Sequence, residues 1–414
     1  MTAYRTLDPE GVKHFLAARR DLAERLGGEA QDWTVREVSD GNLNLVFLVF
    51  GPSGTLCVKQ SLPHVRVDPD WKMPLDRTAF EAAWLRRIEP LAPGLTPAFL
   101  DFDPEQFVLT MECLNGFVTL REALSKGADP IAPSRILGGF VARSAFLTSY
   151  FAQPFEAVAP DLAFFSGNTT LTRITVDLVL TDPYREHPRN HWLPALDADV
   201  AAMRADPRII ARIGALQERF LTTPQALLHG DLHSGSIMIS DRDVRVIDGE
   251  FSLYGPIGFD CGLYLAHLAV AHAATNDVAR KEALTAAIRT FWRTFCSDFL
   301  YLWKTQANGA DLYTPTTFSN APHELDTLRA HFISGVFHDA AGFAAAEIVR
   351  RLIGYAQTSD FDHIQDEQSK ADRQRVALSF ACDLLRDAPA DIDAFTERLR
   401  QDTDLPSTTS PETT

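Results

Sequence analysis

Residues 227–250, LLHGDLHSGSIMISDRDVRVIDGE, constrain the fold of this chain more than any other segment. Two short apolar runs, Ile-Met-Ile and Val-Arg-Val-Ile, flank the polar sequence Ser-Asp-Arg-Asp, a pattern typical of a β-hairpin. Asp231 precedes the first run, and Asp248 and Glu250 follow the second. Because a hairpin brings its two ends together, we expect these three carboxylates to face one cleft from opposite sides.

Carboxylates arranged in this way suit phosphoryl transfer from ATP. That reaction needs one carboxylate near the attacking hydroxyl and further carboxylate oxygens that hold magnesium on the phosphates. The alternative is a surface hairpin with ordinary solvated acids, which accounts for any one of these residues alone. It accounts poorly for an HGD triplet on one arm and a D-x-E triplet on the other. The segment therefore favours a kinase-like site.

The composition argues against several kinds of partner. A formal charge of −16, from 39 basic and 55 acidic residues, disfavours nucleic acid and anionic membranes. With 46% apolar residues the chain can bury substantial cores. Its five cysteines have no metal-ligand or paired spacing, its first residues have no signal-peptide core, and no segment approaches the ~18 uninterrupted apolar residues of a membrane helix. We therefore expect a cytoplasmic protein.

The chain divides into a mixed first third and a mainly helical remainder. An Asp-Pro-Glu helix start at Asp8 predicts a first helix that runs to the glycine pair at 27–28. Apolar periodicity then predicts strands at 33–38, 45–50 and 56–60, a helix at 76–88, and strands at 98–102 and 107–111. Long helical stretches follow at about 134–152, 262–305, 323–357 and 371–387, and residues 403–414 predict a disordered tail.

This order of elements resembles the N-terminal lobe of a protein kinase. The segment 40–44, Asp-Gly-Asn-Leu-Asn, falls where kinases have a phosphate loop, although it is not a GxGxxG and an Asx-type turn is the alternative. Lys59 on the third strand resembles the lysine that contacts the α- and β-phosphates, with Glu81 as its partner on the next helix. Residues 111–114 fall at the inter-lobe hinge, where backbone groups read the adenine edge.

Six motifs carry the resemblance further: DGNLNLVF, KQSLPHVRV, WKMPLDR, HGDLHSGS, IDGEFSLYGPIGFD and EIVRRLIG. Together they resemble the methylthioribose kinases over about residues 5–390. The resemblance implies an α+β, bilobal protein-kinase-like fold, with an N-lobe of antiparallel sheet and helices at 1–114 and a mainly helical C-lobe at 115–402. It also implies a homodimer that uses ATP and Mg²⁺ to phosphorylate the anomeric hydroxyl of S-methyl-5-thioribose in methionine salvage.

The resemblance assigns roles residue by residue. Asp231 matches the catalytic aspartate, which orients the sugar hydroxyl and accepts its proton. Magnesium ligands are implied at Asp248 and Glu250, and nucleotide contacts at Asn44, Lys59, Glu112, Cys113, Leu114, Asp248, Gly249 and Glu250. Two positions depart from the expected pattern: Ser236 replaces the asparagine that many kinases keep five residues after the catalytic aspartate, and Gly249 stands where we expect proline.

Further residues are implied at the acceptor side. Arg350 and Arg351 lie in an otherwise apolar helix and, in this family, line the acceptor pocket, where guanidinium groups suit ribose hydroxyls and the transferred phosphoryl group. The alternative is one arginine that reaches solvent and one structural ion pair. Trp71 resembles the tryptophan of a mobile loop near the nucleotide, with packing on a neighbouring domain as the alternative. We expect His229 and His233 to be structural.

Two other functions stay open. One is a phosphotransferase of the same fold that acts on another small molecule, of the aminoglycoside, choline or homoserine kinase kind. Cationic acceptors favour carboxylates or an aromatic cage, and the two arginines would repel them. The other is an inactive nucleotide-binding scaffold. Retention of Lys59, Asp231, Asp248 and Glu250 together argues against an inactive protein.

Overall fold

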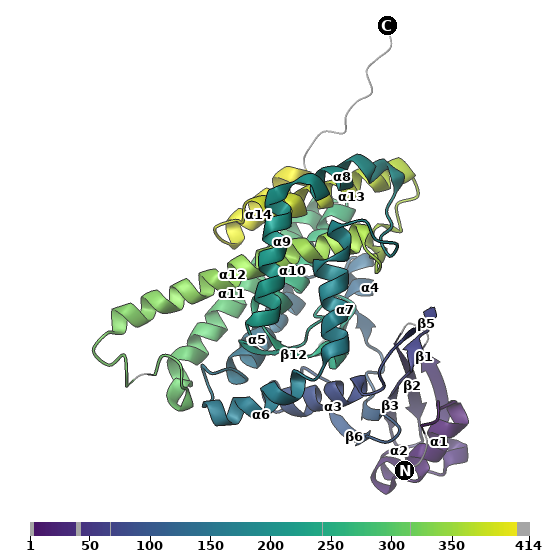
Figure 1. The fold of residues 1–414 in the computed structure, drawn as a ribbon. Coiled ribbons are helices and arrows are strands. Elements are labelled where there is room, and N and C mark those ends of the chain that lie inside the picture. The colour runs from purple at the N-terminus through teal and green to yellow at the C-terminus, as the bar shows by residue number, and fades with distance from the viewer. Residues whose placement is uncertain (1–3, 39–42, 67, 242, 315, 404–414) are drawn as a thin grey trace.

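Alternating apolar residues in the first third of the chain build a five-stranded antiparallel sheet. The computed structural model describes residues 4–403 except 39–42, 67, 242 and 315 (Figure 1). The sheet has the strand order β1-β2-β3-β7-β6, and each predicted strand is confirmed to within a residue at either end. The strands are β1 (Thr34–Val38), β2 (Asn44–Phe50), β3 (Thr55–Ser61), β6 (Phe99–Asp103) and β7 (Val108–Glu112).

Three helices accompany this sheet. The helix α3 (Arg77–Ile88) is confirmed as predicted, and α1 (Pro9–Ala17) and α2 (Arg20–Leu26) contribute to an apolar core with β2 and β3. The prediction of one continuous first helix is wrong, because the helix is interrupted at Arg19, whose backbone is extended. The Arg19 guanidinium donates to the Phe15 carbonyl oxygen and pairs with Asp101 and Asp103 of β6, which holds the break in place.

The central hairpin forms as predicted. Ile237–Ile239 (β10) pairs antiparallel with Val244–Val246 (β11), with Ile237 opposite Val246. Val118–Thr119 (β8) adds to the outer side of β10. Just outside the hairpin, Ala226–Leu228 (β9) pairs antiparallel with Leu253–Gly255 (β12). The two strand pairs together bring the segments around Asp231 and Asp248 side by side.

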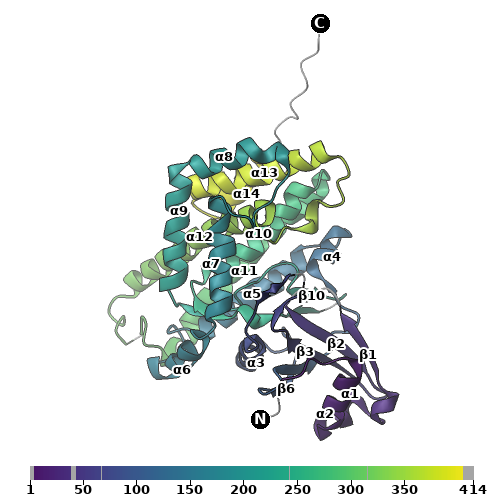
Figure 2. The same cartoon turned by 45° about the vertical axis from the view of Figure 1, so that its right-hand side comes forward.

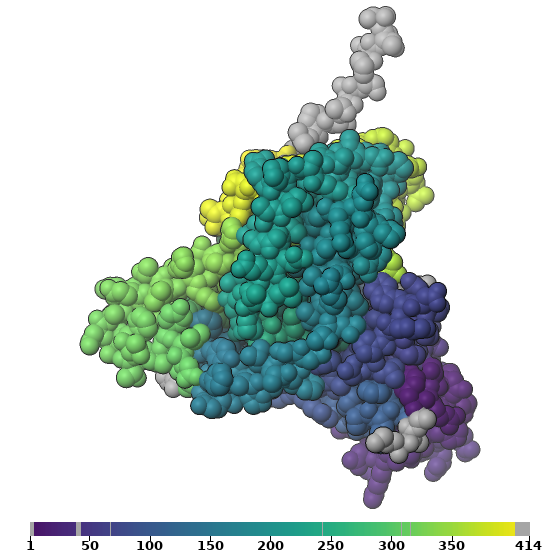
Figure 3. Space-filling view, in the orientation of Figure 1, coloured from purple at the N-terminus to yellow at the C-terminus, as the bar shows by residue number. Residues whose placement is uncertain are grey.

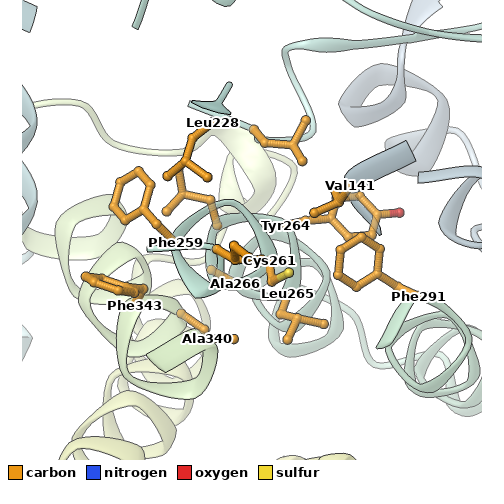
Figure 4. Packing of buried hydrophobic residues seen from close by; sticks show 14 of the residues in the cluster. Val141, Leu228, Phe259, Cys261, Tyr264, Leu265, Ala266, Phe291, Ala340 and Phe343 are labelled. Carbon is orange, nitrogen blue, oxygen red and sulfur yellow. The ribbon is translucent and has the colours of Figure 1, made fainter. Parts of the chain in front are cut away.

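The helical part is organised around α10 (Gly258–Ala274), of which almost every residue is buried. It packs against α11 (Val278–Thr305) and α12 (Pro322–Ile353) in the helical region (Figure 2). Figure 4 shows Tyr264 of α10 beside Phe291 of α11, and Phe259 of α10 beside Phe343 of α12. Gly262 permits the close approach, because a Cβ there would lie 2.7 Å from the Ala340 carbonyl oxygen of α12. The predicted stretch 262–305 is two helices, since Asp277 caps α11 by accepting from two backbone N–H groups.

Several elements were not predicted. They are the strands β4 (His64–Val65) and β5 (Asp68–Lys72) and the helices α4 (Leu120–Ser125), α6 (Phe155–Phe165), α7 (Thr169–Leu180), α8 (Asp197–Ala205), α9 (Pro207–Thr222) and α14 (Ile392–Thr403). The predicted α5 (Ile131–Leu147) and α13 (Glu367–Arg386) are present. Positions 40–42 of the expected phosphate loop and the expected tail beyond Thr403 lie outside the described residues.

The overall arrangement is a bilobal, protein-kinase-like fold. The sheet region lies at the lower right of the helical region, and the far ends of α11 and α12 project to the left (Figure 3). Among the described residues, α12 is the one helix long and apolar enough to span a membrane, and 72% of its most apolar window is buried inside the protein. It is therefore a core helix in this fold.

Candidate active site

A glycine and a buried carboxylate shape the turn that carries Asp231. Gly230 has a φ of +83°, and a Cβ there would overlap the Phe251 carbonyl, so only glycine fits this position. The Asp260 carboxylate, at the start of α10, accepts from the backbone N–H groups of His229 at 2.7 Å and Gly230 at 3.0 Å. The Ser236 hydroxyl donates to the Asp231 carbonyl at 2.9 Å, so Ser236 braces the turn. We expect its hydroxyl to be unavailable as a metal ligand.

His229 joins the two acidic segments. Its Nε2 lies 2.8 Å from the carbonyl oxygen of Ile247, the residue before Asp248, and its Nδ1 accepts from the Asp231 N–H at 3.2 Å. Nε2 therefore carries the proton and donates to Ile247. The expectation of a structural His229 agrees with these bonds, which tie the Asp231 turn to the Asp248 loop.

Asp231 lies between an imidazole and a guanidinium. His233 Nε2 is 3.4 Å from Asp231 Oδ2, and Arg350 Nη1 is 3.7 Å from Asp231 Oδ1. His233 Nδ1 accepts from the Gly235 and Ser236 N–H groups, so Nε2 holds the proton and points at the carboxylate. Burial raises the pKa of Asp231, but His233 and the arginines outweigh it, and the pKa is lowered below its usual value. Asp231 is therefore ionised at neutral pH.

The twin arginines are held by a carboxylate that the sequence analysis did not single out. Glu347, one turn earlier on α12 and fully buried, accepts from Arg351 Nε at 2.6 Å and from Arg350 Nη1 at 3.0 Å. Arg351 is more than nine-tenths buried, the Arg350 side chain is 12% exposed, and His267 Nε2 lies 3.4 Å from Glu347. The spacing i, i+3 and i, i+4 within an apolar helix is the signal that could have identified Glu347.

Lys59 connects the sheet to the Asp248 loop. It lies on β3 opposite Val46 and Leu109, and its ammonium group pairs with Glu81 of α3 at 2.6 Å and with Asp248. Burial lowers the pKa of Lys59, but Asp248 and Glu81 together raise it above its usual value, so the lysine is charged. Glu81 shares that one cation, and burial raises its pKa to about 7. The predicted Lys59–Glu81 partnership is present.

Glu250 is held by residues from the sheet region. Its Oε2 accepts from Asn44 Nδ2 at 3.0 Å and lies 3.5 Å from Arg77 Nε. Arg77 is fully buried and also donates to the Asn44 side chain at 3.2 Å and the Leu62 carbonyl at 3.1 Å. Arg77 was not predicted as a site residue, although it is the last residue of the WKMPLDR motif. Asn44 and Glu250 thus meet across 206 positions of the chain.

Asp248 and Glu250 fit magnesium by their chemistry. The Asp248 side chain is 46% exposed with one oxygen on Lys59, so its other oxygen is available, whereas the Glu250 side chain is 3% exposed. Among the described residues, His, Cys, Asp and Glu side chains form no group of three or more that could hold a metal by itself. Two carboxylates completed by phosphate oxygens and water are the usual ligand set of Mg²⁺.

Not every residue predicted for the site lies beside these acids. Glu112 ends β7 opposite Leu56, three positions from Lys59 along β3, and its side chain accepts from the Ala98 N–H at 3.1 Å. The neighbouring Cys113 and Leu114 are half-buried and lie in the segment that connects the sheet region to the helical region. Trp71 of β5 packs on Tyr355, with ring centroids 5.5 Å apart, and under the Arg189 guanidinium. Trp71 therefore contacts the segment after α12, in agreement with the alternative of packing on the other lobe.

An apolar hollow lies beside Asp231. It is narrow in this structure, with a cavity volume of about 10 Å³, and Asp231 and Arg350 lie on one side of it. Its apolar wall comes from α7, from the segment after Glu250 and from α10, and consists of Ile174, Leu178, Phe251, Phe259 and Leu263. The space holds about one water molecule, but the chemistry of its lining, a polar edge beside an apolar wall, matches a ligand with one hydroxylated and one apolar end.

A family model and curated relatives show the family of the chain. Residues 34–293 match the phosphotransferase enzyme family. The chain is 33% identical over 92% of its length to methylthioribose kinase 2 of Oryza sativa subsp. japonica, and 36% identical over 97% to the methylthioribose kinase of Pectobacterium carotovorum, covering 92% and 99% of those proteins. A solved structure of Plasmodium vivax ethanolamine kinase is similar with a TM-score of 0.47 and 11% identity, over 91% of this chain and 88% of that one.

Proposed function

Since the chain belongs to the methylthioribose kinase family of phosphotransferases, we propose that it phosphorylates the anomeric hydroxyl of S-methyl-5-thioribose at the expense of ATP, in methionine salvage. The observation that supports this most is the pairing of Asp231 with Arg350, 3.7 Å apart, next to the segment in which Asp248 pairs with Lys59. One side is equipped for a hydroxylated acceptor and the other for phosphates.

The nucleotide occupies the side of the cleft formed by the sheet. Lys59 neutralises the α- and β-phosphates, Asn44 contributes an amide, and the backbone of residues 112–114 reads the adenine edge. Asp248 and Glu250, on either side of Gly249, hold Mg²⁺, which when bound neutralises charge on the phosphates and keeps them in line. The exposed oxygen of Asp248 supports this role.

Asp231 acts on the acceptor hydroxyl. The anomeric oxygen forms the new bond to the γ-phosphorus, the bond from that phosphorus to the bridging oxygen breaks, and ADP leaves. The hydroxyl proton passes to an Asp231 oxygen as the new bond forms. A carboxylate with a lowered pKa is a weak base, so alignment is its larger contribution. The His233 N–H keeps one Asp231 oxygen occupied and the other turned to the acceptor.

The acceptor lies between the arginines and the apolar hollow. Arg350 and Arg351 donate to ribose hydroxyls and to the phosphoryl group in transfer, and the methylthio group packs against the apolar wall that Leu178 and Phe251 form. Burial of a methyl group there contributes roughly 0.8 kcal/mol. Because Arg350 and Arg351 both present positive charge on the acceptor side, a cationic acceptor is disfavoured.

Turnover with defined acceptors tests the proposal. Purified protein with Mg-ATP should release ADP with S-methyl-5-thioribose, and kanamycin, choline and homoserine should not substitute. Equal turnover with choline or kanamycin would refute the assigned acceptor. Leu178→Asn should raise the KM for S-methyl-5-thioribose about tenfold and leave that for ATP unchanged, while Leu221→Asn, at a position 57% exposed on α9, serves as the control.

The lobe limits, the oligomeric state and the location of the protein are further proposals. We propose lobe limits of 1–114 and 115–402, supported by the separate apolar core that Val12, Phe47 and Val49 form in the first of these. We also propose a homodimer in the cytoplasm. Sedimentation analysis tests the dimer, and limited proteolysis between the lobes tests the boundary.

A further inference from the structure

Trp84 occupies the space beside Gly249, the middle residue of the D-x-E triplet. Trp84 lies on α3 and is 1% exposed. A Cβ placed on Gly249 would lie 2.5 Å from Trp84 Cε3 and 2.6 Å from Cδ2, both carbons of a rigid ring. The φ angle of Gly249 is not positive, so its backbone conformation does not itself require glycine. A side chain at this position, the expected proline included, would therefore have to displace either the indole ring or the loop.

The same ring contacts the segment that carries Asp231. Trp84 meets the His229 ring edge-on, with centroids 5.1 Å apart and an interplanar angle of 89°. His229 in turn bonds the Ile247 carbonyl at 2.8 Å, directly before Asp248. One side chain of the sheet region therefore touches both acidic segments of the helical region.

Trp84 also shares a helix face with Glu81. The two residues are three positions apart on α3, so they lie on neighbouring turns of one face, and both are buried. Glu81 binds Lys59 at 2.6 Å, while Trp84 bears on the loop of Asp248, the second partner of Lys59. The spacing between α3 and this loop therefore sets whether Lys59 reaches both carboxylates.

We propose that Trp84 is a positioning residue, which seats the 248–250 loop at a fixed distance from Lys59 and Glu81 through its contact with the bare backbone of Gly249. The role of Trp84 in catalysis rests on the proposed function. Its effect on nucleotide and metal binding is independent of which acceptor the protein uses.

A side chain at 249 should displace the loop, and a smaller residue at 84 should restore it. Gly249→Ala should weaken Mg-ADP binding about tenfold in calorimetry, lower kcat at least tenfold and leave the KM for the acceptor within twofold. Binding of ADP without Mg²⁺ should change little, because Asp248 and Glu250 act through the metal. The double variant Gly249→Ala/Trp84→Val should recover most of the lost Mg-ADP affinity. If Gly249→Ala acted only by lowering stability, the binding of ADP without Mg²⁺ would weaken as well.

Gly214→Ala is the matched control, since nothing lies within 4 Å of a Cβ there. Should Gly249→Ala fail to fold, Trp84→Phe in the native background tests the same contact, with an expected three- to tenfold loss of Mg-ADP affinity. The proposal is overturned if Gly249→Ala and Trp84→Phe bind Mg-ADP as the unmodified protein does, or if the double variant is no better than Gly249→Ala. Failure of S-methyl-5-thioribose as acceptor would overturn the proposed function and leave these binding results to stand.

Discussion

Replacing Glu347 by glutamine should reveal how far one buried carboxylate holds the acceptor arginines in place. Glutamine keeps the volume of the side chain and removes its charge. Glu347 is fully buried and accepts from Arg351 at 2.6 Å and Arg350 at 3.0 Å. Burial raises the pKa of Glu347, but the two arginines outweigh it and hold the pKa well below its usual value, so the carboxylate is charged.

The expected cost follows from what the substitution leaves behind. Removing one partner of a buried ion pair costs about 3–5 kcal/mol. Arg350 retains Asp231 at 3.7 Å, so we expect a loss near the lower end, about 3 kcal/mol, in the free energy of unfolding measured with urea. Arg350, freed from Glu347, should turn further toward Asp231 and compete with the acceptor hydroxyl. The acceptor KM should rise about tenfold, equivalent to roughly 1.4 kcal/mol, with the ATP KM unchanged.

The pH dependence of stability gives a second measurement. The folded pKa of Glu347 lies below the unfolded value of about 4.3, so its contribution is complete above that pH and is lost as the pH falls further. The two proteins should therefore converge in stability in acid. Glu324→Gln, at an exposed position in the first turn of the same helix, should change stability by less than about 0.5 kcal/mol. Equal urea midpoints and equal acceptor KM for Glu347→Gln and the unmodified protein would refute the reasoning.

Three further predictions follow from the same geometry. Asp231→Asn should lower kcat by about 10²–10⁴ with Mg-ADP affinity retained, and a wild-type rate would remove Asp231 from the mechanism. Lys59→Met leaves Glu81 and Asp248 without their shared cation, so Mg-ATP binding measured by calorimetry should weaken at least tenfold. Burial lowers the pKa of His272 to about 3 against about 6.5 unfolded, so the folded state loses stability as the pH falls below 6.5. His272→Leu should remove about 2 kcal/mol of the loss between pH 7 and pH 5, and an unchanged pH slope in urea unfolding would contradict this.

The sequence predicted those parts of the fold in which the signal is local. The hairpin formed with the expected ends because its two apolar runs and its polar turn lie within one short segment. Lys59 and Glu81 were paired correctly because a strand and the next helix each have a readable period. The helix break at Arg19 was missed, since the carboxylates that hold it lie more than eighty positions away on β6.

The site shows the same division between local and distant contacts. Asp231, Asp248 and Glu250 lie on adjacent segments, but the side chains that hold Asp248 and Glu250 come from residues far away in the sequence. Arg77 and Asn44 hold Glu250, and the ring of Trp84 determines what Gly249 can be. A periodic pattern shows that such a residue is buried, but it does not identify what the residue faces, because that depends on how the two lobes meet. The residues that position a reactive group are therefore harder to predict than the reactive group itself. For Asp248 and Glu250 they come from the other lobe, whereas the turn of Asp231 is held within its own lobe by Asp260.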